Sequence, residues 1–252
     1  MLASQRKLTD ANMDRFKILT NNALKIIACV SMVFDHIGVI MFPNAIWLRA
    51  IGRLAYSLFA FCIAEGCFYT KDKIKHLIVI AMLGVVIQLF EYVFLEMIDL
   101  SIFIVFSISI ILIYLLDDID KAIRNKKKIT SIISISIFLA LVVGLNILTY
   151  YTLIFEANFG YYGIMVPVIL YAIKKYLNKH SWWIYIDCIA LAFLFVARTF
   201  ITNNVVVLFS FLVIPLLLMY NEKRGKWKIK YFFYLFYPLH LVVIYLINLL
   251  IR

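Results

Sequence analysis

Charged residues are scarce in this 252-residue chain: Asp, Glu, Lys and Arg make up 15% of it, whereas soluble domains carry roughly 25%. Hydrophobic residues make up 65% and are spread over the whole chain, which excludes both a soluble globule and a soluble domain with one anchor. Long apolar runs such as 77–89 and 205–220 alternate with short basic loops, unlike the short alternating strands of a β-barrel. We therefore predict an all-α, polytopic transmembrane helical bundle.

Cysteine is limited to four residues, and all of them fall in apolar stretches: Cys29, Cys62, Cys67 and Cys188. None lies in a loop where an oxidising compartment would pair it, and no CxxC pair or histidine cluster suggests a metal site. The pattern predicts buried thiols and no metal cofactor.

Charged or turn-rich breaks divide the chain into nine expected helices. They cover residues 24–42, 50–69, 75–95, 101–116, 129–150, 160–175, 182–200, 204–220 and 231–250. Several approach the ~20 residues that cross a bilayer. The eighth follows the seventh across Thr202-Asn203-Asn204, which requires a tight turn. We expect residues 1–23 to form a cytoplasmic N-terminal segment and residues 24–252 a single integral membrane domain.

Basic residues gather in alternate connections. Of the 25 Lys and Arg residues, 21 lie in the N-terminal segment or in every second loop, as expected for the cytoplasmic side of a membrane protein. The other side keeps four: Arg49, Arg53, Arg198 and Arg252. The pattern predicts a cytoplasmic N-terminus and an outside C-terminus. Because these loops explain the net charge of +11, we expect no nucleic-acid partner.

Five ionisable residues lie within the expected helices, where such side chains are costly and are functional candidates by default. They are Asp35, His36, Arg53, Glu65 and His240. Asp35 and His36 lie roughly 17 Å beyond the inner end of the first helix. Arg53 reaches a similar depth on the second, where it either pairs with Asp35 or binds a carboxylate of an acceptor.

The two histidines are candidates for proton transfer. His36 either hydrogen-bonds a helix or, next to Asp35, gains basicity and accepts a proton. His240 follows Pro238, which can kink the last helix and bring this second histidine within reach of His36. Glu65 lies near the inner end of its helix, where it either holds a cofactor or locks helices together.

Lys25 precedes His36 by eleven residues, about three helical turns, so both project from one face of the first helix. A cation at the cytosolic mouth and an imidazole roughly 16 Å deeper suit a long phosphate-bearing donor. The alternative is an ordinary interfacial lysine that snorkels toward the headgroups.

Four separated motifs, in order, resemble the TraX family, and together they span nearly the whole chain. They are Leu24-Lys25-Ile26-Ile27-Ala28 with Asp35-His36-Ile37-Gly38; Gly52-Arg53-Leu54-Ala55-Tyr56 through Ala64-Glu65-Gly66; Phe159-Gly160-Tyr161-Tyr162-Gly163 with Pro167; and Asn221 to Gly225 with Lys230 to Tyr234 and Tyr237-Pro238-Leu239-His240.

TraX is known as a pilin N-acetylase of conjugation systems and is similar to membrane acyltransferases that use cytosolic acyl-CoA. The resemblance implies that Lys25 binds CoA phosphates and that His36 serves acetyl transfer. Lys25 departs from the arginine of the broader group but agrees with the TraX pattern. Glu156 stands where an aspartate is expected just before the Tyr-Gly segment, and it is the candidate to substitute for that aspartate.

These observations predict an integral membrane acetyltransferase that uses acetyl-CoA to modify an amine or hydroxyl of an exported peptide, lipid or cell-surface glycan. His36, oriented by Asp35, acts as base or acetyl carrier and His240 as a second proton-transfer group, while Arg53, Tyr161 and Tyr162 shape the acceptor's entrance. The location expected is a bacterial plasma membrane. Two alternatives stay open: a transporter or channel with an Asp/His/Arg/Glu relay, and a scaffold whose polar residues only join helices.

Overall fold

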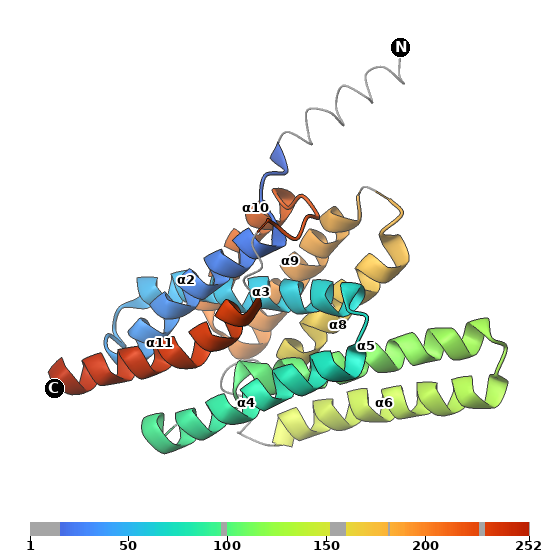
Figure 1. Cartoon of the computed structure of the whole chain (residues 1–252), viewed down its shortest axis with the longest axis horizontal. Coiled ribbons are helices and arrows are strands. Elements are labelled where there is room, and N and C mark those ends of the chain that lie inside the picture. Colours follow the sequence, from blue (N-terminus) through green and yellow to red (C-terminus); the bar gives the residue numbers. More distant parts are fainter. Residues whose placement is uncertain (1–15, 97–99, 152–159, 181, 227–229, 252) are drawn as a thin grey trace, which may run out of the picture. The chain divides into compact units, whose positions relative to one another are not determined.

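The computed structural model describes residues 16–96, 100–151, 160–180, 182–226 and 230–251 (Figure 1). Within these ranges the chain forms nine α-helices and one 3₁₀ helix, with no strand and only one isolated bridge, between Leu19 and Tyr220. The prediction of an all-α membrane protein is confirmed. Seven of the helices in the described part are long and apolar enough to cross a membrane: α2, α3, α4, α5, α6, α9 and α11.

The nine expected helices correspond to the observed elements. These are α2 Asn21–Ile40, α3 Ile46–Tyr69, α4 Lys73–Leu95, α5 Ile102–Arg124, α6 Lys128–Tyr151, α8 Gly160–Leu177, α9 Trp183–Thr202, the 3₁₀ helix η1 Val205–Leu212 with α10 Val213–Leu218, and α11 Lys230–Ile251. The sixth and eighth, α8 and the η1–α10 pair, are not among the seven candidate spans.

The fourth helix is longer than predicted. The sequence suggested an end at residue 116, because acidic residues follow, yet α5 continues to Arg124. Asp117 within the added turns is hydrogen-bonded by Tyr171 and Lys175 of α8. Because these partners satisfy the carboxylate, Asp117 is accommodated in the middle of α5, and the helix continues past it.

The described residues divide into two compact units. Unit 1 comprises residues 1–62 and 179–252, and unit 2 comprises residues 63–178. Helix α3 contributes its first part to unit 1 and its last two turns to unit 2.

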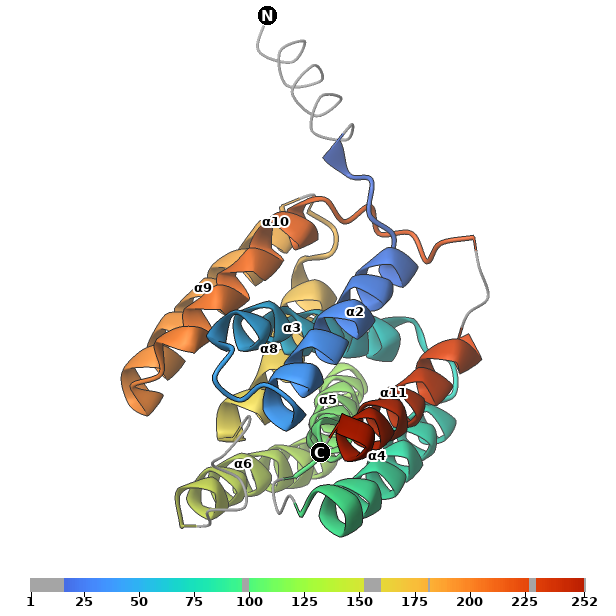
Figure 2. The same ribbon diagram turned by 90° about the vertical axis from the view of Figure 1, so that its left-hand side faces the viewer.

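In unit 1, α2 packs along α11, as Figure 2 shows. Thr20 caps the start of α2 by accepting a hydrogen bond from the backbone N–H of Ala23 at 3.2 Å. The backbone N–H groups of Asn21 and Asn22, in the first turn of α2, donate to the carbonyls of Lys223 and Arg224 at 2.8 and 3.1 Å. Lys223 and Arg224 are thereby held at the first turn of α2.

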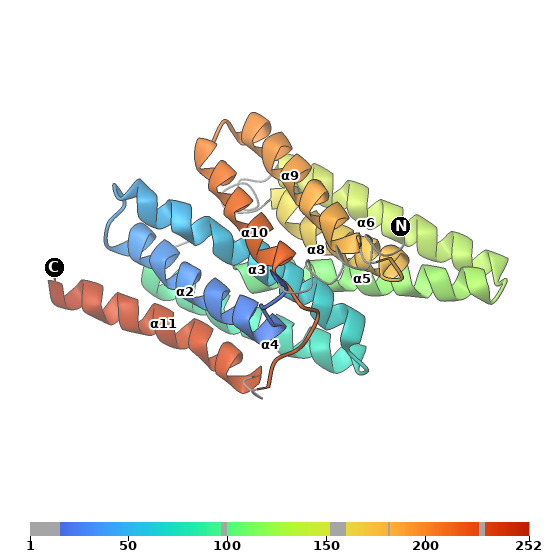
Figure 3. The same cartoon turned by 90° about the horizontal axis from the view of Figure 1, so that it is seen from above.

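The expected tight turn between the seventh and eighth segments is present. Asn203 adopts a left-handed conformation with φ of 51° at the end of α9, and Asn204 accepts a hydrogen bond from the N–H of Val206 at 3.0 Å. Asparagine tolerates this backbone region better than most residues. The chain can therefore reverse at once into η1 and α10, which pack back on α9 (Figure 3).

In unit 2, α5 is the central helix and contacts α4, α6 and α8. Ser101 joins α4 to the start of α5 by donating to the carbonyl of Gly84 at 3.2 Å, and Ser109 joins α5 to α8 by donating to the carbonyl of Ile164 at 2.8 Å. Such interhelical bonds from serine are typical where apolar packing alone gives little direction.

All four cysteines are free and buried. The prediction of buried thiols is confirmed.

Candidate functional site

His36 and His240 lie against each other in unit 1, where α2 meets α11. His240 Nε2 is 3.0 Å from His36 Nδ1, and the ring centroids are 4.9 Å apart. Phe236 stacks on the His240 ring, and Tyr237 meets both histidine rings edge-on. The expectation that His240 comes within reach of His36 is confirmed.

The contacts of the two rings assign their tautomers. A carbonyl oxygen only accepts, so a neutral ring nitrogen beside one must carry the hydrogen. His240 Nδ1 lies 3.0 Å from the Phe236 carbonyl and therefore donates, which leaves its Nε2 as an acceptor. His36 Nδ1 lies 3.0 Å from both the Met32 carbonyl and that Nε2, so its N–H is shared between them. The basic nitrogen of His36 is Nε2, which no described residue hydrogen-bonds.

Lys25 and His36 both face α11. Lys25 Nζ lies 5.7 Å from the centroid of the Phe233 ring of α11, near the start of that helix, and His36 meets α11 farther along at His240. No described carboxylate pairs with Lys25. The predicted shared face of α2 is therefore present, with a cation near one end of the α2–α11 seam and an imidazole pair farther along.

Asp35 does not have the partners that the sequence suggested. Its Oδ1 lies 3.2 Å from Nη1 of Arg49 in an ion pair that is not aligned as a hydrogen bond, and neither His36 nor Arg53 pairs with it among the described residues. Successive helical residues point about 100° apart, so Asp35 faces α3 while His36 faces α11. Of the two roles left open for Arg53, the bridge to Asp35 is thus not the one observed, and His36 is oriented by Met32 and His240 rather than by Asp35, contrary to expectation.

Close packing between α2 and α3 explains why Asp35 pairs with Arg49 rather than with Arg53. A Cβ at Gly52 would lie 2.3 Å from Asp35 Oδ1 and 2.4 Å from Asp35 Cβ, so α3 approaches Asp35 as closely as only glycine permits. Arg49, three residues earlier and near the start of α3, is the arginine that this register brings to the carboxylate.

Glu65 has a defined partner in unit 2. Its carboxylate forms an ion pair with Lys174 of α8, and both side chains are almost completely buried. Lys174 Nζ also donates to the Tyr69 hydroxyl at 3.3 Å and lies over the Phe68 ring. Of the two roles expected for Glu65, this contact supports the joining of helices.

Tyr161 and Tyr162 are half-buried in the first turn of α8 in unit 2. Glu156, the candidate to replace an aspartate before this segment, lies outside the described residues.

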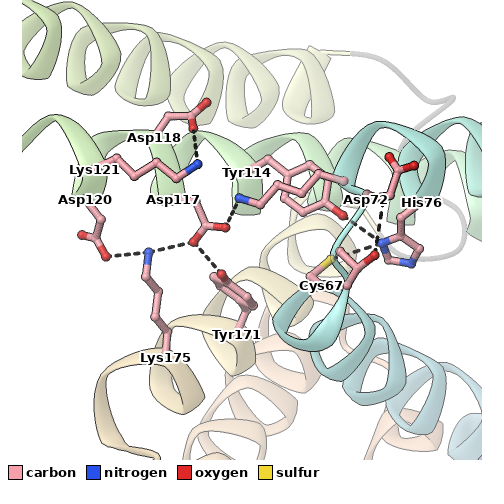
Figure 4. A network of polar contacts seen from close by, with 12 residues as sticks. Cys67, Asp72, His76, Tyr114, Asp117, Asp118, Asp120, Lys121, Tyr171 and Lys175 are labelled. Carbon is pink, nitrogen blue, oxygen red and sulfur yellow. Dashed lines mark hydrogen bonds and ion pairs between the residues drawn. The ribbon is translucent and has the colours of Figure 1, made fainter.

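A second polar network, which the sequence analysis missed, occupies unit 2 (Figure 4). Asp117 accepts hydrogen bonds from Tyr171 at 2.5 Å and from Lys175 at 2.8 Å, and it pairs with Lys73. Lys175 also reaches Asp120 at 2.5 Å. The signal was present in the sequence, because apolar residues at 119, 122 and 123 continue the helical period past Asp117.

His76 and Tyr114 extend the polar contacts of unit 2. His76 Nδ1 lies 2.9 Å from the Tyr114 hydroxyl and 4.0 Å from the buried thiol of Cys67. Each titratable group named in this network thus has a protein partner.

The family model described as TraX protein matches residues 20–248. The chain belongs to the TraX family. The match includes both histidines, the arginines of α3 and the ion pairs of unit 2, so the expected resemblance is confirmed. This TraX-family chain is a multi-pass membrane protein.

Two curated relatives share a part of the sequence. An uncharacterized protein of Rickettsia prowazekii (strain Madrid E), RP591, is 37% identical over 67 residues, which is 27% of this chain and 25% of the relative. A probable fimbrial assembly protein of Dichelobacter nodosus, FimC of serogroup H1, is 34% identical over 71 residues, 27% of this chain and 29% of the relative. The chain thus matches less than a third of each relative's length. No solved structure matches it.

Proposed function

We propose that this TraX-family protein is an acetyltransferase that moves the acetyl group of cytosolic acetyl-CoA to an amine or hydroxyl of an exported acceptor. The observation that carries the proposal is the α2–α11 seam. It holds a cation without a described carboxylate partner near one end and, about three helical turns deeper, a histidine pair whose contacts leave Nε2 of His36 as a base.

The donor binds at the cytosolic end of this seam. Lys25 and the basic residues of the loop before α11 hold the phosphates of CoA, because an ammonium group acts as a point-charge phosphate ligand. The loop is fixed over α2 by the backbone bonds of Asn21 and Asn22, which place Lys223 and Arg224 at the same end of α2 as Lys25.

His36 supplies the proton transfer. The acceptor gives a proton to Nε2 of His36, its nitrogen or oxygen bonds to the thioester carbonyl carbon, and the carbon–sulfur bond breaks. The departing CoA thiolate takes the proton back from His36. His240 stabilises the intermediate imidazolium, because its Nε2 accepts the hydrogen bond that His36 Nδ1 strengthens on protonation.

The proposal includes an orientation and an acceptor class. The alternation of basic loops supports a cytoplasmic N-terminus in a bacterial inner membrane, with the acceptor entering from the outside. The name of the Dichelobacter nodosus relative, a probable fimbrial assembly protein, supports a pilin-like peptide as the acceptor. A lipid and a cell-surface glycan are the other acceptor classes.

The experiment gives acetyl-labelled CoA to the purified protein in nanodiscs and measures CoA binding, thioester hydrolysis and label on the protein. Wild type should bind and hydrolyse acetyl-CoA, and His36→Ala should bind it without turnover. Label that appears on wild type but not on His36→Ala would indicate an acetyl carrier, whereas hydrolysis without label indicates a base. Full activity of His36→Ala would remove this residue from the mechanism. Absence of CoA binding, with solute or proton flux in liposomes, would favour a transporter instead.

A further inference from the structure

Three polar residues share one face of α3 in unit 1. Arg49, Arg53 and Ser57 are spaced four residues apart, so they follow one another along the helix from its start. Arg49 is engaged by Asp35, whereas Arg53 and Ser57 extend the same line deeper into the unit.

The local charge on this face is positive. The charges that act on the guanidinium of Arg53 are those of Arg49, Arg198 and Asp35, that is, two cations and one carboxylate. Three of the four basic residues that the loop pattern assigns to the outer side therefore gather at one place. That side is where basic residues are otherwise rare in this chain.

Two donors at this place are unsatisfied. Nε of Arg53 and Oγ of Ser57 are buried and have no hydrogen-bond partner, and Ser57 is 0% exposed. A buried donor without a partner costs free energy, and it costs more when the donor belongs to a charged group such as the half-buried side chain of Arg53. A ligand with acceptor oxygens and a negative charge would satisfy both donors and the excess positive charge.

We propose that Arg53 and Ser57, with the field of Arg49 and Arg198, form a binding site for an oxyanion carried by the acyl acceptor. A guanidinium presents paired N–H donors that match the two oxygens of a carboxylate or phosphate. The site adjoins Asp35, which precedes His36 in α2, and the charge of Arg49 acts on both of these residues, so an acceptor held here by its anionic group lies beside the stretch of α2 that carries the base. This inference rests on the proposed function and specifies its acceptor as an anionic one.

The test uses the full-length protein in phosphatidylcholine nanodiscs and two peptides with a free amino terminus that differ only in Glu or Gln at the second position. A second pair of probes, O-phosphoethanolamine and ethanolamine, tests whether the site binds a phosphate group. Binding is read as the rise in melting temperature, which needs no acetyl transfer. The variants are Arg53→Gln and Arg53→Lys. The control is Arg124→Gln, which removes an arginine whose side chain is 73% exposed in unit 2.

We expect at least one anionic probe to bind wild type about tenfold or more tightly than its neutral partner. Arg53→Gln should abolish that difference, Arg53→Lys should retain part of it, and Arg124→Gln should retain all of it. Without ligand, Arg53→Gln should melt no lower than wild type, because it removes a buried donor without a hydrogen-bond partner and a positive charge that lies near two other arginines. A marked loss of melting temperature in Arg53→Gln, or equal binding of charged and neutral probes, would overturn the proposal.

Further measurements identify the source of the anionic ligand and separate the anion site from the proposed acetyltransferase activity. If phosphatidylglycerol in the nanodisc stabilises wild type but not Arg53→Gln, while no soluble probe does, the ligand is a lipid headgroup and the assignment to the acceptor is overturned. Charge-dependent binding without any CoA turnover would contradict the acetyltransferase and spare the anion site. His36-dependent turnover without charge-dependent binding would support the acetyltransferase and contradict the anion site.

Discussion

The two units of this protein differ in whether the polar atoms of their ionisable residues have protein partners. In unit 2, Asp117 is met by two lysines and a tyrosine, and Glu65 is met by Lys174. In unit 1, Nε of Arg53 has no hydrogen-bond partner, and among the described residues none hydrogen-bonds Nε2 of His36. Both units carry ionisable residues in membrane-spanning helices, so charge alone does not distinguish a binding site from a helix contact.

The difference lies in unused hydrogen-bonding capacity. A network whose donors and acceptors are paired stabilises one arrangement of its helices, and breaking it exposes an uncompensated charge. A donor or base that stays unpaired gains its partner from a ligand. We therefore assign chemistry to unit 1 and helix packing to the network of unit 2, and the following predictions test that division.

The largest effect is expected at His36. His36→Gln removes the proposed base and should lower acetyl transfer by about 10²–10⁴-fold, the usual contribution of a general base. The melting temperature should change little, because His36 donates only to acceptors that can take water or the glutamine amide instead. Initial rates with acetyl-labelled CoA measure the first effect and thermal unfolding measures the second.

His76→Gln is the matched control in unit 2, since His76 is also a histidine in a hydrogen bond, to Tyr114 at 2.9 Å. It should lose stability but keep its rate per folded protein. A hundredfold loss of rate in His76→Gln would contradict the division between the units.

The next effect is on stability, at two neighbouring aspartates. Asp117→Asn leaves Lys73 and Lys175 without this carboxylate and should cost about 3 kcal/mol, or a melting temperature lower by about 5–10 °C. Asp118→Asn breaks only its surface pair with Lys121, with side chains 61% and 65% exposed, and should cost at most about 0.5 kcal/mol. Equal melting temperatures of the two variants would show that the network of unit 2 contributes nothing measurable.

A smaller effect is expected from the close approach of α3 to Asp35. Gly52→Ala places a methyl group 2.4 Å from Asp35 Cβ and should cost about 1–3 kcal/mol. Asp35→Ala should not rescue it, because the Cβ atom remains. Gly144→Ala is the control: a Cβ at Gly144 meets nothing within 4 Å, so the change should be neutral or stabilise the helix by up to about 1 kcal/mol. Similar losses in both variants would contradict the packing at Gly52.

Helical periodicity was enough to predict much of this structure. The apolar runs located the helices, the spacing of Lys25 and His36 predicted their shared face, and Asn203 predicted the reversal after α9. These features depend on local sequence, where a period of 3.6 residues fixes which side chains share a side.

The partners of the charged residues were not predictable in the same way. Arg49 and Arg53 lie four residues apart on one face, so sequence spacing cannot decide which of them meets Asp35. The decision comes from the register between α2 and α3, which the missing side chain of Gly52 permits. The partners of Asp117 were hidden for a related reason, since these lysines and the tyrosine come from α4 and α8. The end of α5 itself was within reach of the sequence, because apolar residues at 119, 122 and 123 continue the helical period past the acidic residues.

The smallest effect is expected at Lys25, which tests whether a cation without a carboxylate partner in unit 1 binds a ligand. Its ammonium lies over the Phe233 ring at 5.7 Å, a geometry worth about 0.5–1 kcal/mol. If Lys25 holds CoA phosphates, Lys25→Gln should raise KM for acetyl-CoA about two- to fivefold with kcat unchanged, because it removes binding that the substrate and transition state share. Lys25→Arg, which keeps the charge, should restore most of the affinity. An unchanged KM in steady-state kinetics would reduce Lys25 to an interfacial lysine, while a lower kcat in Lys25→Gln would place its charge nearer the reacting thioester than the α2–α11 seam suggests.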